Sequence, residues 1–337
     1  MAAVVACAHG DQVICDAANY TRVKVTGHAD GRLLLSQDDG SITSVPLGRV
    51  QRMVIDSVGG MADLNDAERY LAENDLEKAI VRYERALRMG TEFWPTIIRV
   101  RLLQACDRAG KFERAVDHFV AVAQEAPSAA AAMIPASIPQ GRRPETKGLV
   151  RRLTSEANRS TRDEQRVLLE LLRYAVLLEG EDPEAARWTR EVAATAIPAG
   201  IGTAAVYRIR VAACAELLAA GALEDLLDSV NQAAADCPLE VLPELLFLKG
   251  RALLERASNR EDLLIAGTTL MRVAIHFPDD ARAPEALFWA AKVHERLDRR
   301  GKAVQLLNEC LNHARVSQSV RQRAEADLLR LEQEPSE

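Results

Sequence analysis

The segment Gly200–Ala205 reads GIGTAA and matches a cofactor-binding pattern. In that pattern, G-x-G-x-x-G/A, the glycines let the backbone approach the pyrophosphate of a dinucleotide at a helix N-terminus. The chemistry needs a buried strand directly before the glycines. The preceding residues, WTREVAATAIPA, have the spacing of a helix that ends at Pro198. We therefore interpret Gly200–Ala205 as a joint between helices, and nucleotide or small-molecule binding there as the alternative.

Histidines, cysteines and paired carboxylates are the other groups that could do chemistry. The histidines are His9, His28, His118, His276, His294 and His313, and the cysteines are Cys7, Cys15, Cys106, Cys214, Cys237 and Cys310. No His pair has the H-E-x-x-H spacing, no Cys pair forms C-x-x-C, and no G-x-S-x-G or P-loop occurs. The adjacent aspartates at 38–39 and 279–280 lie in turn-like sequence. The sequence predicts a protein that is not an enzyme, with no catalytic residue, metal or cofactor.

Composition limits the class of protein. The 337 residues are 48% hydrophobic and 27% charged, as in folded globular proteins, and only 4% aromatic. Lys and Arg number 43 and Asp and Glu 49, which gives a net charge of -6 without a basic cluster. This distribution argues against nucleic-acid binding. No apolar run approaches the roughly 18–20 residues that a membrane-spanning helix needs, so we expect no transmembrane segment.

Residues 1–10, MAAVVACAHG, contain small residues like those at the end of a secretory signal. Val4–Cys7 also resembles a bacterial lipoprotein cleavage box. Because no basic residue precedes this short apolar run, the alternative is an ordinary chain terminus. We expect a periplasmic or cell-envelope protein rather than a cytoplasmic one, with membrane association only through a lipid near Cys7. In an oxidising compartment, Cys7 and Cys15 could pair.

Residues 11–58 have the composition of a small β domain. Five short runs, QVIC, YTRVKVTG, RLLLSQ, SITSV and VQRMVI, are separated mainly by Asp/Gly-rich turns, which is the pattern of strands and hairpins. A flat sheet of this size buries little surface, so we expect it to curl into a five-stranded barrel that hides its edges. The tight Pro-Leu-Gly turn before the last run makes it resemble Sm-like and Src-homology-type barrels. That resemblance implies RNA, peptide or cell-wall binding, or a structural contact.

From residue 61 onward the hydrophobic spacing is that of helices. Within 61–127, Asn74 and Asp75 supply a break and a helix cap. Two sets of residues, Ala79, Tyr83 and Ala86, then Ala115, Phe119 and Val122, recur in steps of four and three. The two alanines that start these sets are 36 residues apart, and Pro127 follows the second by 12. We therefore predict two helix-turn-helix repeats.

The same spacing returns near the C-terminus. The matching sets are Ala266, Leu270 and Val273, then Ala303, Leu307 and Cys310, 37 residues further on. The pattern resembles tetratricopeptide repeats, helix-turn-helix units of about 34 residues with Ala-x-x-x-Phe in the second helix and a closing Pro. The resemblance implies a mainly α fold, a right-handed α-solenoid whose first helices line a concave surface.

The region between the two sets of repeats is less regular. Residues 128–161 include three prolines and two glycines in SAAAAMIPASIPQGRRPETKG, so we expect an irregular insertion. Residues 162–337 are expected to form further degenerate helical hairpins. They end in a polar capping helix, as terminal repeats require.

Two related stretches are candidates for partner binding. PELLFLKGRALLER starts at Pro243 and PEALFWAAKVHERL at Pro284, 41 residues later. Each places a phenylalanine four residues before a cation, which would suit an extended peptide. The candidate residues are Phe247, Arg251, Phe288, Lys292 and Glu295. The alternative is that both aromatic rings pack between repeats.

The function expected is that of a noncatalytic protein-interaction scaffold or assembly factor. The C-terminal part resembles tetratricopeptide repeats of bacterial envelope assembly factors, namely the lipoprotein of the outer-membrane barrel-assembly machine and the Tol-Pal coordinator. Those families imply protein or peptide partners and no cofactor. The alternatives are a nucleotide- or small-molecule-binding protein or enzyme that uses Gly200–Ala205 or 128–161, and RNA binding through the N-terminal barrel.

Overall fold

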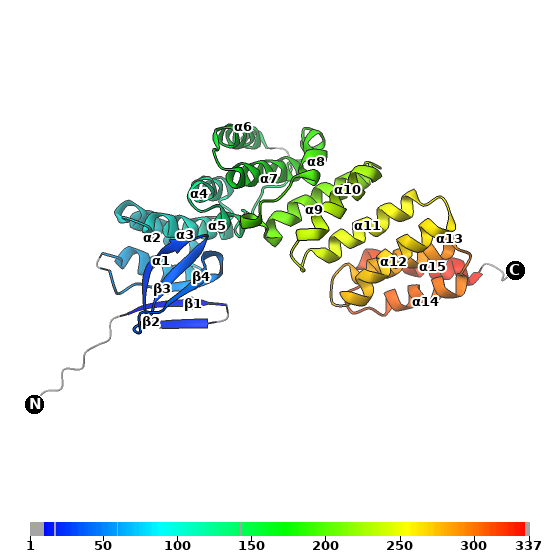
Figure 1. The fold of residues 1–337 in the computed structure, drawn as a ribbon, viewed down its shortest axis with the longest axis horizontal. Helices are drawn as coiled ribbons and strands as arrows, with labels where there is room; N and C mark the ends of the chain where they lie inside the picture. Colours follow the sequence, from blue (N-terminus) through cyan, green and yellow to red (C-terminus); the bar gives the residue numbers. More distant parts are fainter. Residues whose placement is uncertain (1–9, 17, 59, 142, 334–337) are drawn as a thin grey trace, which may run out of the picture. The chain divides into compact units, whose positions relative to one another are not determined.

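The computed structural model describes residues 10–333 except 17, 59 and 142 (Figure 1). Over these residues it contains five strands followed by 15 α-helices, so the expected mainly α fold with an N-terminal β region is confirmed. The chain divides into two compact units. The first comprises the described residues up to Ala185 together with Ile197–Val206. The second comprises Ala186–Ala196 and the described residues from Tyr207 onward.

The five strands form one antiparallel sheet at the start of the first unit. They are β1 (Asp11–Cys15), β2 (Ala18–Ala29), β3 (Arg32–Ser36), β4 (Ile42–Pro46) and β5 (Val50–Val54), with a 3-10 turn η1 (Leu47–Arg49) before β5. All five predicted strands are confirmed. The strand order is β4-β3-β2-β1-β5, and no β4–β5 pairing occurs among the described residues. The sheet is therefore not closed, and the expectation that barrel closure hides its edges is wrong.

The long strand β2 lets this small sheet bend. Its first half pairs with β1 and its second half with β3. At the crossing, Asp11 pairs with Val23 and Gln12 with Thr21, so Arg22 is an extra residue in a β-bulge. Arg22 has a φ of 57°, a left-handed conformation that increases the local twist. The bend brings apolar side chains from all five strands into one core, which contains Val13, Val23, Val25, Leu33, Leu35, Val45 and Met53.

A buried carboxylate closes one end of the sheet. The Asp11 side chain, 0% exposed, accepts a hydrogen bond from the backbone N–H of Val25 at 2.8 Å. It also accepts from the backbone N–H groups of Asp56 and Ser57 at 2.9 and 2.8 Å, and from the Ser57 hydroxyl at 2.7 Å. Because a buried carboxylate is tolerated only when it is hydrogen-bonded, these four donors explain its position. Asp11 thus fixes the chain where it leaves β5.

The helices of the first unit pack mainly in chain order. They are α1 (Ala62–Ala72), α2 (Leu76–Met89), α3 (Trp94–Arg108), α4 (Phe112–Glu125), α5 (Pro127–Ala131), α6 (Pro144–Arg159) and α7 (Asp163–Glu179). The break at Asn74 is confirmed by its φ of 60°, and the Asp75 side chain caps α2 by accepting from the backbone N–H of Lys78 at 3.3 Å. The residues that set the repeat spacing, from Ala79 to Val122, are buried in this packing.

The expectation of an irregular insertion at residues 128–161 is wrong for much of that range. It begins in α5 and contains the 16-residue helix α6, which packs on α7. The physical reason is that Pro144 lies in the first turn of α6, where its missing N–H costs nothing and its fixed φ favours the helix. Among the described residues, the irregular part is confined to the stretch between α5 and α6.

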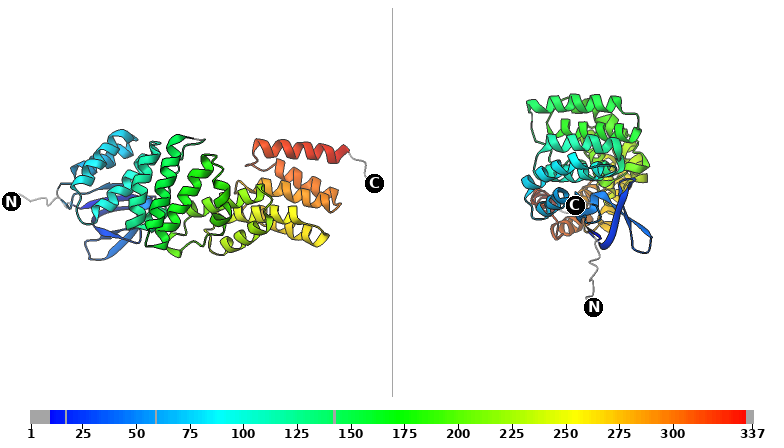
Figure 2. Two further views of the ribbon diagram at one scale, coloured as in Figure 1. Left: turned by 90° about the horizontal axis from the view of Figure 1, so that it is seen from above. Right: turned by 90° about the vertical axis from the view of Figure 1, so that its left-hand side faces the viewer.

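The second unit is wholly helical over its described residues. It contains α8 (Ala185–Ala194) except its first residue and α9 (Ala204–Ala219) except its first three residues. Its other helices are α10 (Leu223–Asp236), α11 (Leu242–Arg256), α12 (Arg260–His276), α13 (Ala283–Arg296), α14 (Arg300–Leu311) and α15 (Gln318–Gln333). From α10 onward, each packs on the next in the chain (Figure 2). The repeat positions Ala266, Leu270, Ala303 and Leu307 are buried. None of the described helices is long and apolar enough to span a membrane.

Gly250 is the point of closest approach between α11 and α12. A Cβ atom at this position would lie 2.6 Å from Cγ of Leu270, which is fully buried. A contact this short forces Leu270 or the helix to move. By contrast, a Cβ at Gly301, in α14 of the same unit, would meet nothing within 4 Å. Gly250 is buried in the middle of its helix, whereas Gly301 is exposed in the first turn of α14.

We predict that Gly250→Ala and Gly301→Ala change stability in opposite directions. Overpacking against Leu270 should cost about 1–3 kcal/mol at Gly250. At Gly301 the better helix propensity of Ala should raise the free energy of unfolding by up to about 1 kcal/mol. Urea denaturation followed by circular dichroism measures both. A loss of stability in both variants, or in neither, would contradict the close approach of α11 and α12.

Candidate functional site

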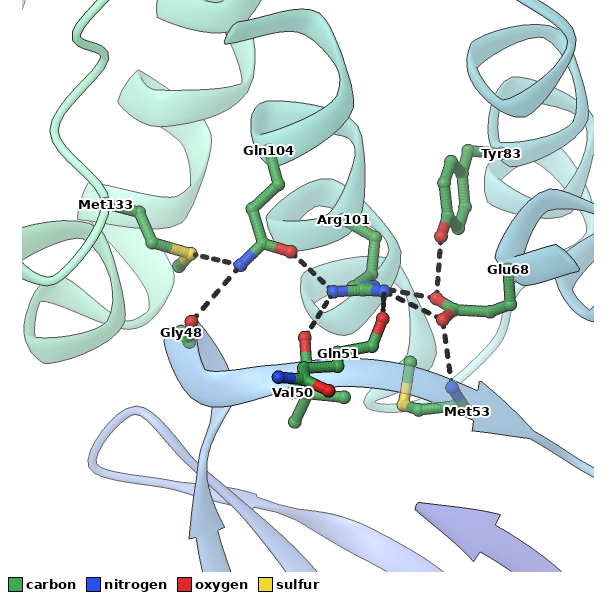
Figure 3. Close-up of polar contacts among 9 residues, drawn as sticks. All are labelled: Gly48, Val50, Gln51, Met53, Glu68, Tyr83, Arg101, Gln104 and Met133. Atoms are coloured by element: carbon green, nitrogen blue, oxygen red, sulfur yellow. Dashed lines mark hydrogen bonds and ion pairs between the residues drawn. The ribbon is translucent and has the colours of Figure 1, made fainter. Parts of the chain in front are cut away.

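A buried ion pair joins the sheet to the first helices. Glu68 of α1 and Arg101 of α3 are 0% and 2% exposed (Figure 3). Nε of Arg101 donates to Oε1 of Glu68 at 2.7 Å, and Nη2 donates to Oε2 at 2.8 Å. This two-point contact matches the planar guanidinium to the planar carboxylate, the geometry in which such pairs are strongest.

The remaining polar atoms of the pair are also bonded. Arg101 Nη1 donates to the carbonyl of Val50 at 2.6 Å and to Oε1 of Gln104 at 2.6 Å, and Nη2 donates to the carbonyl of Gln51 at 2.8 Å. Glu68 accepts from the backbone N–H of Met53 at 2.9 Å and from the hydroxyl of Tyr83 at 2.7 Å. A buried ion pair offsets its desolvation only when its other donors and acceptors are satisfied, and here they are.

A second β-bulge makes this arrangement available. Ile14 of β1 pairs with Arg52 and Cys15 with Val50, so Gln51 is the extra residue in β5. In a regular strand, consecutive carbonyls point to opposite sides, whereas the bulge lets those of Val50 and Gln51 both reach Arg101. The outer edge of β5 therefore bonds to helix side chains instead of another strand.

Asn65 of α1 extends the same cover along β5. Its amide nitrogen donates to the carbonyl of Ile55 at 2.9 Å, and its Oδ1 accepts from the N–H of Ile55 at 2.8 Å. Asn65 thus makes the two hydrogen bonds that a neighbouring strand would make. This edge is therefore not left exposed to pair with another chain. This is what covers the β5 edge in place of the barrel closure expected from the sequence.

Sequence reasoning missed the pair of Glu68 and Arg101. The available signal was a charged residue inside an apolar stripe. Glu68 lies beside Leu64, Ala67 and Leu71, which are all buried. Arg101 likewise interrupts the apolar face of α3. Two such interruptions of opposite sign, in helices separated by one other helix, are a signal for a buried pair, because a lone buried charge is costly.

The electrostatics fit a structural role for this network. Burial lowers the pKa of Arg101, but Glu68 and Tyr83 raise it more, and the result lies above the ordinary value. Burial, and then the Glu68 charge, raise the pKa of the Tyr83 phenol. Both side chains are almost fully buried, so the network holds the ion pair in a fixed place between the sheet and the helices.

A pocket of about 690 Å³ opens beside the pair. Its walls come from β1, β5, the end of α1, α3 and the chain after α5. Gln104 connects it to the network, because its amide lies 3.2 Å from Sδ of Met133, a lining residue (Figure 3). The lining residues are Ile14, Val50, Gln51, Arg52, Leu71, Ala72, Arg101, Leu103, Gln104, Asp107, Arg108, Ala132, Met133 and Ile134.

The structure places Gly200–Ala205 between two helices. Helix α8 ends at Ala194, the turn η2 (Ala199–Ile201) follows, and α9 starts at Ala204. The element directly before the glycines is the helix α8 and not a strand, so the dinucleotide geometry is not formed. A pocket of about 540 Å³ borders Gly200, but its charged side chains, Asp30, Glu125, Glu164 and Arg162, include three carboxylates and one guanidinium. That balance repels phosphate.

The two candidate aromatic residues lie inside the second unit. Phe247 of α11 and Phe288 of α13 are 4% and 3% exposed, so their rings pack between helices, as the alternative interpretation has it. Arg251 stacks 3.6 Å from the ring centroid of Trp289 and donates to Glu255 at 2.7 Å. The expected alignment of ring and cation does exist for Lys292, whose Nζ lies 5.9 Å from the Phe288 ring.

The other candidate charges are paired with the last helix. Lys292 Nζ lies 2.7 Å from Oδ2 of Asp327, and Oε1 of Glu295 lies 2.6 Å from Nη2 of Arg330. Lys292 and Glu295 also contact each other at 3.2 Å. Helix α15 thus packs against one side of α13. Its charged residues pair with Lys292 and Glu295, which we expected from the sequence to bind a partner protein.

Comparison with known proteins assigns no family to the chain. Neither a protein-family model nor a curated protein sequence matches it. The candidate lipidation or disulfide at Cys7, and residues 1–9 in general, lie outside the described residues.

We predict strong coupling between Glu68 and Arg101. Arg101→Met leaves a buried carboxylate without its cation, and Glu68→Leu leaves a buried cation, so each should cost about 3–5 kcal/mol of stability. The double variant should cost much less than the sum, because it buries no charge. Urea denaturation of the four proteins measures this coupling energy.

Arg210 of α9 is the matched control for the previous prediction. It is also 2% exposed, but among the described residues its hydrogen bonds go to the carbonyl of Ala193 alone, at 3.2 and 2.8 Å, and burial lowers its pKa. Arg210→Met leaves no carboxylate behind and should therefore cost less than Arg101→Met. The role assigned to the ion pair would be contradicted in two cases. Either the losses of stability from Glu68→Leu and Arg101→Met add up in the double variant, or Arg210→Met costs as much stability as Arg101→Met.

We predict that the network makes stability fall at alkaline pH. The raised pKa of Tyr83 means that the unfolded chain releases the phenol proton above pH about 10, whereas the folded chain retains it. The contribution of the Tyr83 phenol to the free energy of unfolding is complete below that pH. It is lost as the pH rises towards the folded-state pKa. Tyr83→Phe should reduce this slope by up to about 1.4 kcal/mol per pH unit. Denaturation of the unmodified and Tyr83→Phe proteins between pH 8 and 11 measures the two slopes. Equal slopes would contradict a contribution of Tyr83 to the pH dependence.

Proposed function

We propose that this chain is a noncatalytic scaffold that binds protein partners on a tetratricopeptide-like array of helical hairpins. The observation that carries the proposal is the order of packing. Within α1–α4 and within α10–α15, each helix contacts mainly its neighbours in the chain, and the recurring small and large residues, such as Ala79 with Tyr83 and Ala266 with Leu270, are buried between them. Arrays of this kind form extended surfaces for other proteins.

The N-terminal sheet fits the proposal as an added contact module. Its strand order, bent β2 and 3-10 turn before β5 support an open sheet of the Sm-like or Src-homology type. Because α1 and α3 bond to β5, the sheet and the first hairpins form one unit. We propose that the sheet extends the array as a rigid part, not as an independently moving domain.

The proposed partner surface on the second unit is the exposed part of the first helices α11 and α13. Because Phe247 and Phe288 are buried, we assign recognition to the polar side chains around them. Arg251 and Glu255 are the most direct candidates on α11, with 18% and 39% of their side chains exposed. At such a position Arg251 can donate to carboxylates and backbone carbonyls of an extended peptide, and Glu255 can accept from its backbone N–H groups.

Site-specific crosslinking tests this surface. A photoreactive residue at position 255 on α11 should capture a partner protein, while the same residue at position 272, an exposed site on the second helix α12, should not. The captured partner is then purified. Its affinity should fall about tenfold for Arg251→Gln through loss of a charged hydrogen bond, and stay within about twofold for Arg272→Gln.

Circular dichroism must show unchanged helicity in both variants. Capture at position 272 but not at 255, or equal affinity of the Arg251→Gln protein, would contradict partner binding on the first helices. Charge reversal at Lys292 is a poorer test, because Lys292 pairs with Asp327 and its loss would disturb α15.

A further inference from the structure

We propose that the 690 Å³ pocket beside the Glu68–Arg101 pair binds a carboxylate joined to an aliphatic chain. This site is separate from the first-helix surface of α11 and α13. It is formed entirely by residues 14–134, within the first unit. Its volume lies in the range of small-molecule sites, about 300–1,000 Å³.

Arg52 provides the anchor. It lies on β5, opposite Ile14 of β1, and both side chains line the pocket. Nε of Arg52 is buried and has no hydrogen-bond partner among the described residues. That nitrogen is closed to water, so a ligand would reach Arg52 through its outer guanidinium nitrogens. Among the described residues Arg52 forms no ion pair, and an unpaired guanidinium that lines a pocket is a site for an acidic group of a ligand.

The charge of the lining favours a monoanion. The charge of Arg101 is neutralised by Glu68. The other charged lining residues, Arg52, Arg108 and Asp107, together carry a net charge of +1. Asp107 is also occupied, because its Oδ1 accepts the backbone N–H groups of residues 136 and 137 at 3.0 and 2.9 Å. A carboxylate matches one guanidinium in both charge and shape.

The apolar walls define the rest of the ligand. Leu71, Leu103, Met133 and Ile134 face the pocket together with Ile14. Methionine adapts its shape to aliphatic groups, and none of the lining side chains is aromatic, so the pocket has no surface on which a base could stack. Aliphatic carboxylates fit this lining, whether they are short fatty acids or the C-terminal residues of a peptide with aliphatic side chains.

Calorimetry with two acid probes and their neutral counterparts tests the site on the full chain. The probes are octanoate against octanamide, and acetyl-Ala-Ala-Leu-Leu with a free carboxylate against the same peptide amidated. At least one acid should bind saturably and about tenfold or more tightly than its amide, because the amide lacks the charged hydrogen bond to Arg52. The probe that binds more tightly identifies the source, fatty acid or peptide end.

Variants locate the binding. Arg52→Met keeps an unbranched apolar side chain but removes the charge, and should weaken the acid about tenfold or more. Arg49→Met removes the same charge from an exposed neighbour outside the lining and should change affinity less than twofold. The NMR signal of the Met133 methyl group should shift with the acid probe. The acid-to-amide ratio on the unmodified chain keeps the test valid even if Arg52→Met does not fold.

Three results would overturn the proposal. They are no saturable binding of either acid up to about 10 mM, equal binding of acid and amide, and an equal loss in the Arg49→Met and Arg52→Met proteins. The last would mean that net charge alone attracts the probe. Each of these results leaves the partner surface on α11 untouched, because the crosslinking sites there lie in the other unit.

Discussion

The ion pair of Glu68 and Arg101 is the interaction on which the first unit depends. An edge strand has unpaired backbone groups that must bond to something or be left exposed. Here the carbonyls of Val50 and Gln51 and the N–H of Met53 bond to two buried charged side chains. The charges tolerate burial only because they face each other. The ion pair of Glu68 and Arg101 therefore covers the edge of β5 and fixes the packing of α1, α2 and α3 at the same time.

Other buried charged side chains show how the group that bonds to a buried charge affects it. Asp11 is buried without a cation and relies on four hydrogen-bond donors, mostly backbone N–H groups. Arg210 is buried with a single carbonyl acceptor, and its pKa falls. Arg101 is just as buried, yet its pKa rises because a carboxylate faces it. The type of partner, not the degree of burial, decides how each charge is accommodated.

The second unit uses the same chemistry at its surface. Lys292 and Glu295 alternate with Asp327 and Arg330 between α13 and α15. These side chains are partly exposed, so each pair adds little stability by itself. Their arrangement nevertheless sets which face α15 presents to α13, while three buried apolar residues, Val320, Ala324 and Leu331, anchor it. Helix α15 is thus held by a few apolar residues and has a mainly polar outer surface.

The sequence by itself determined the elements and most of the core. Short apolar runs between turn residues predicted all five strands. The steps of four and three that link Ala79 to Tyr83 or Ala266 to Leu270 predicted helices whose buried faces are correct, because side-chain periodicity is a local property. Pro144 misled the interpretation of residues 128–161, since a proline starts a helix as readily as it ends one. Only the tertiary structure decided how the sheet edge is covered and which buried charges pair. Glu68 and Arg101 are 33 residues apart, so their positions inside apolar stripes indicate burial of each charge, but only the folded chain shows that the two face each other.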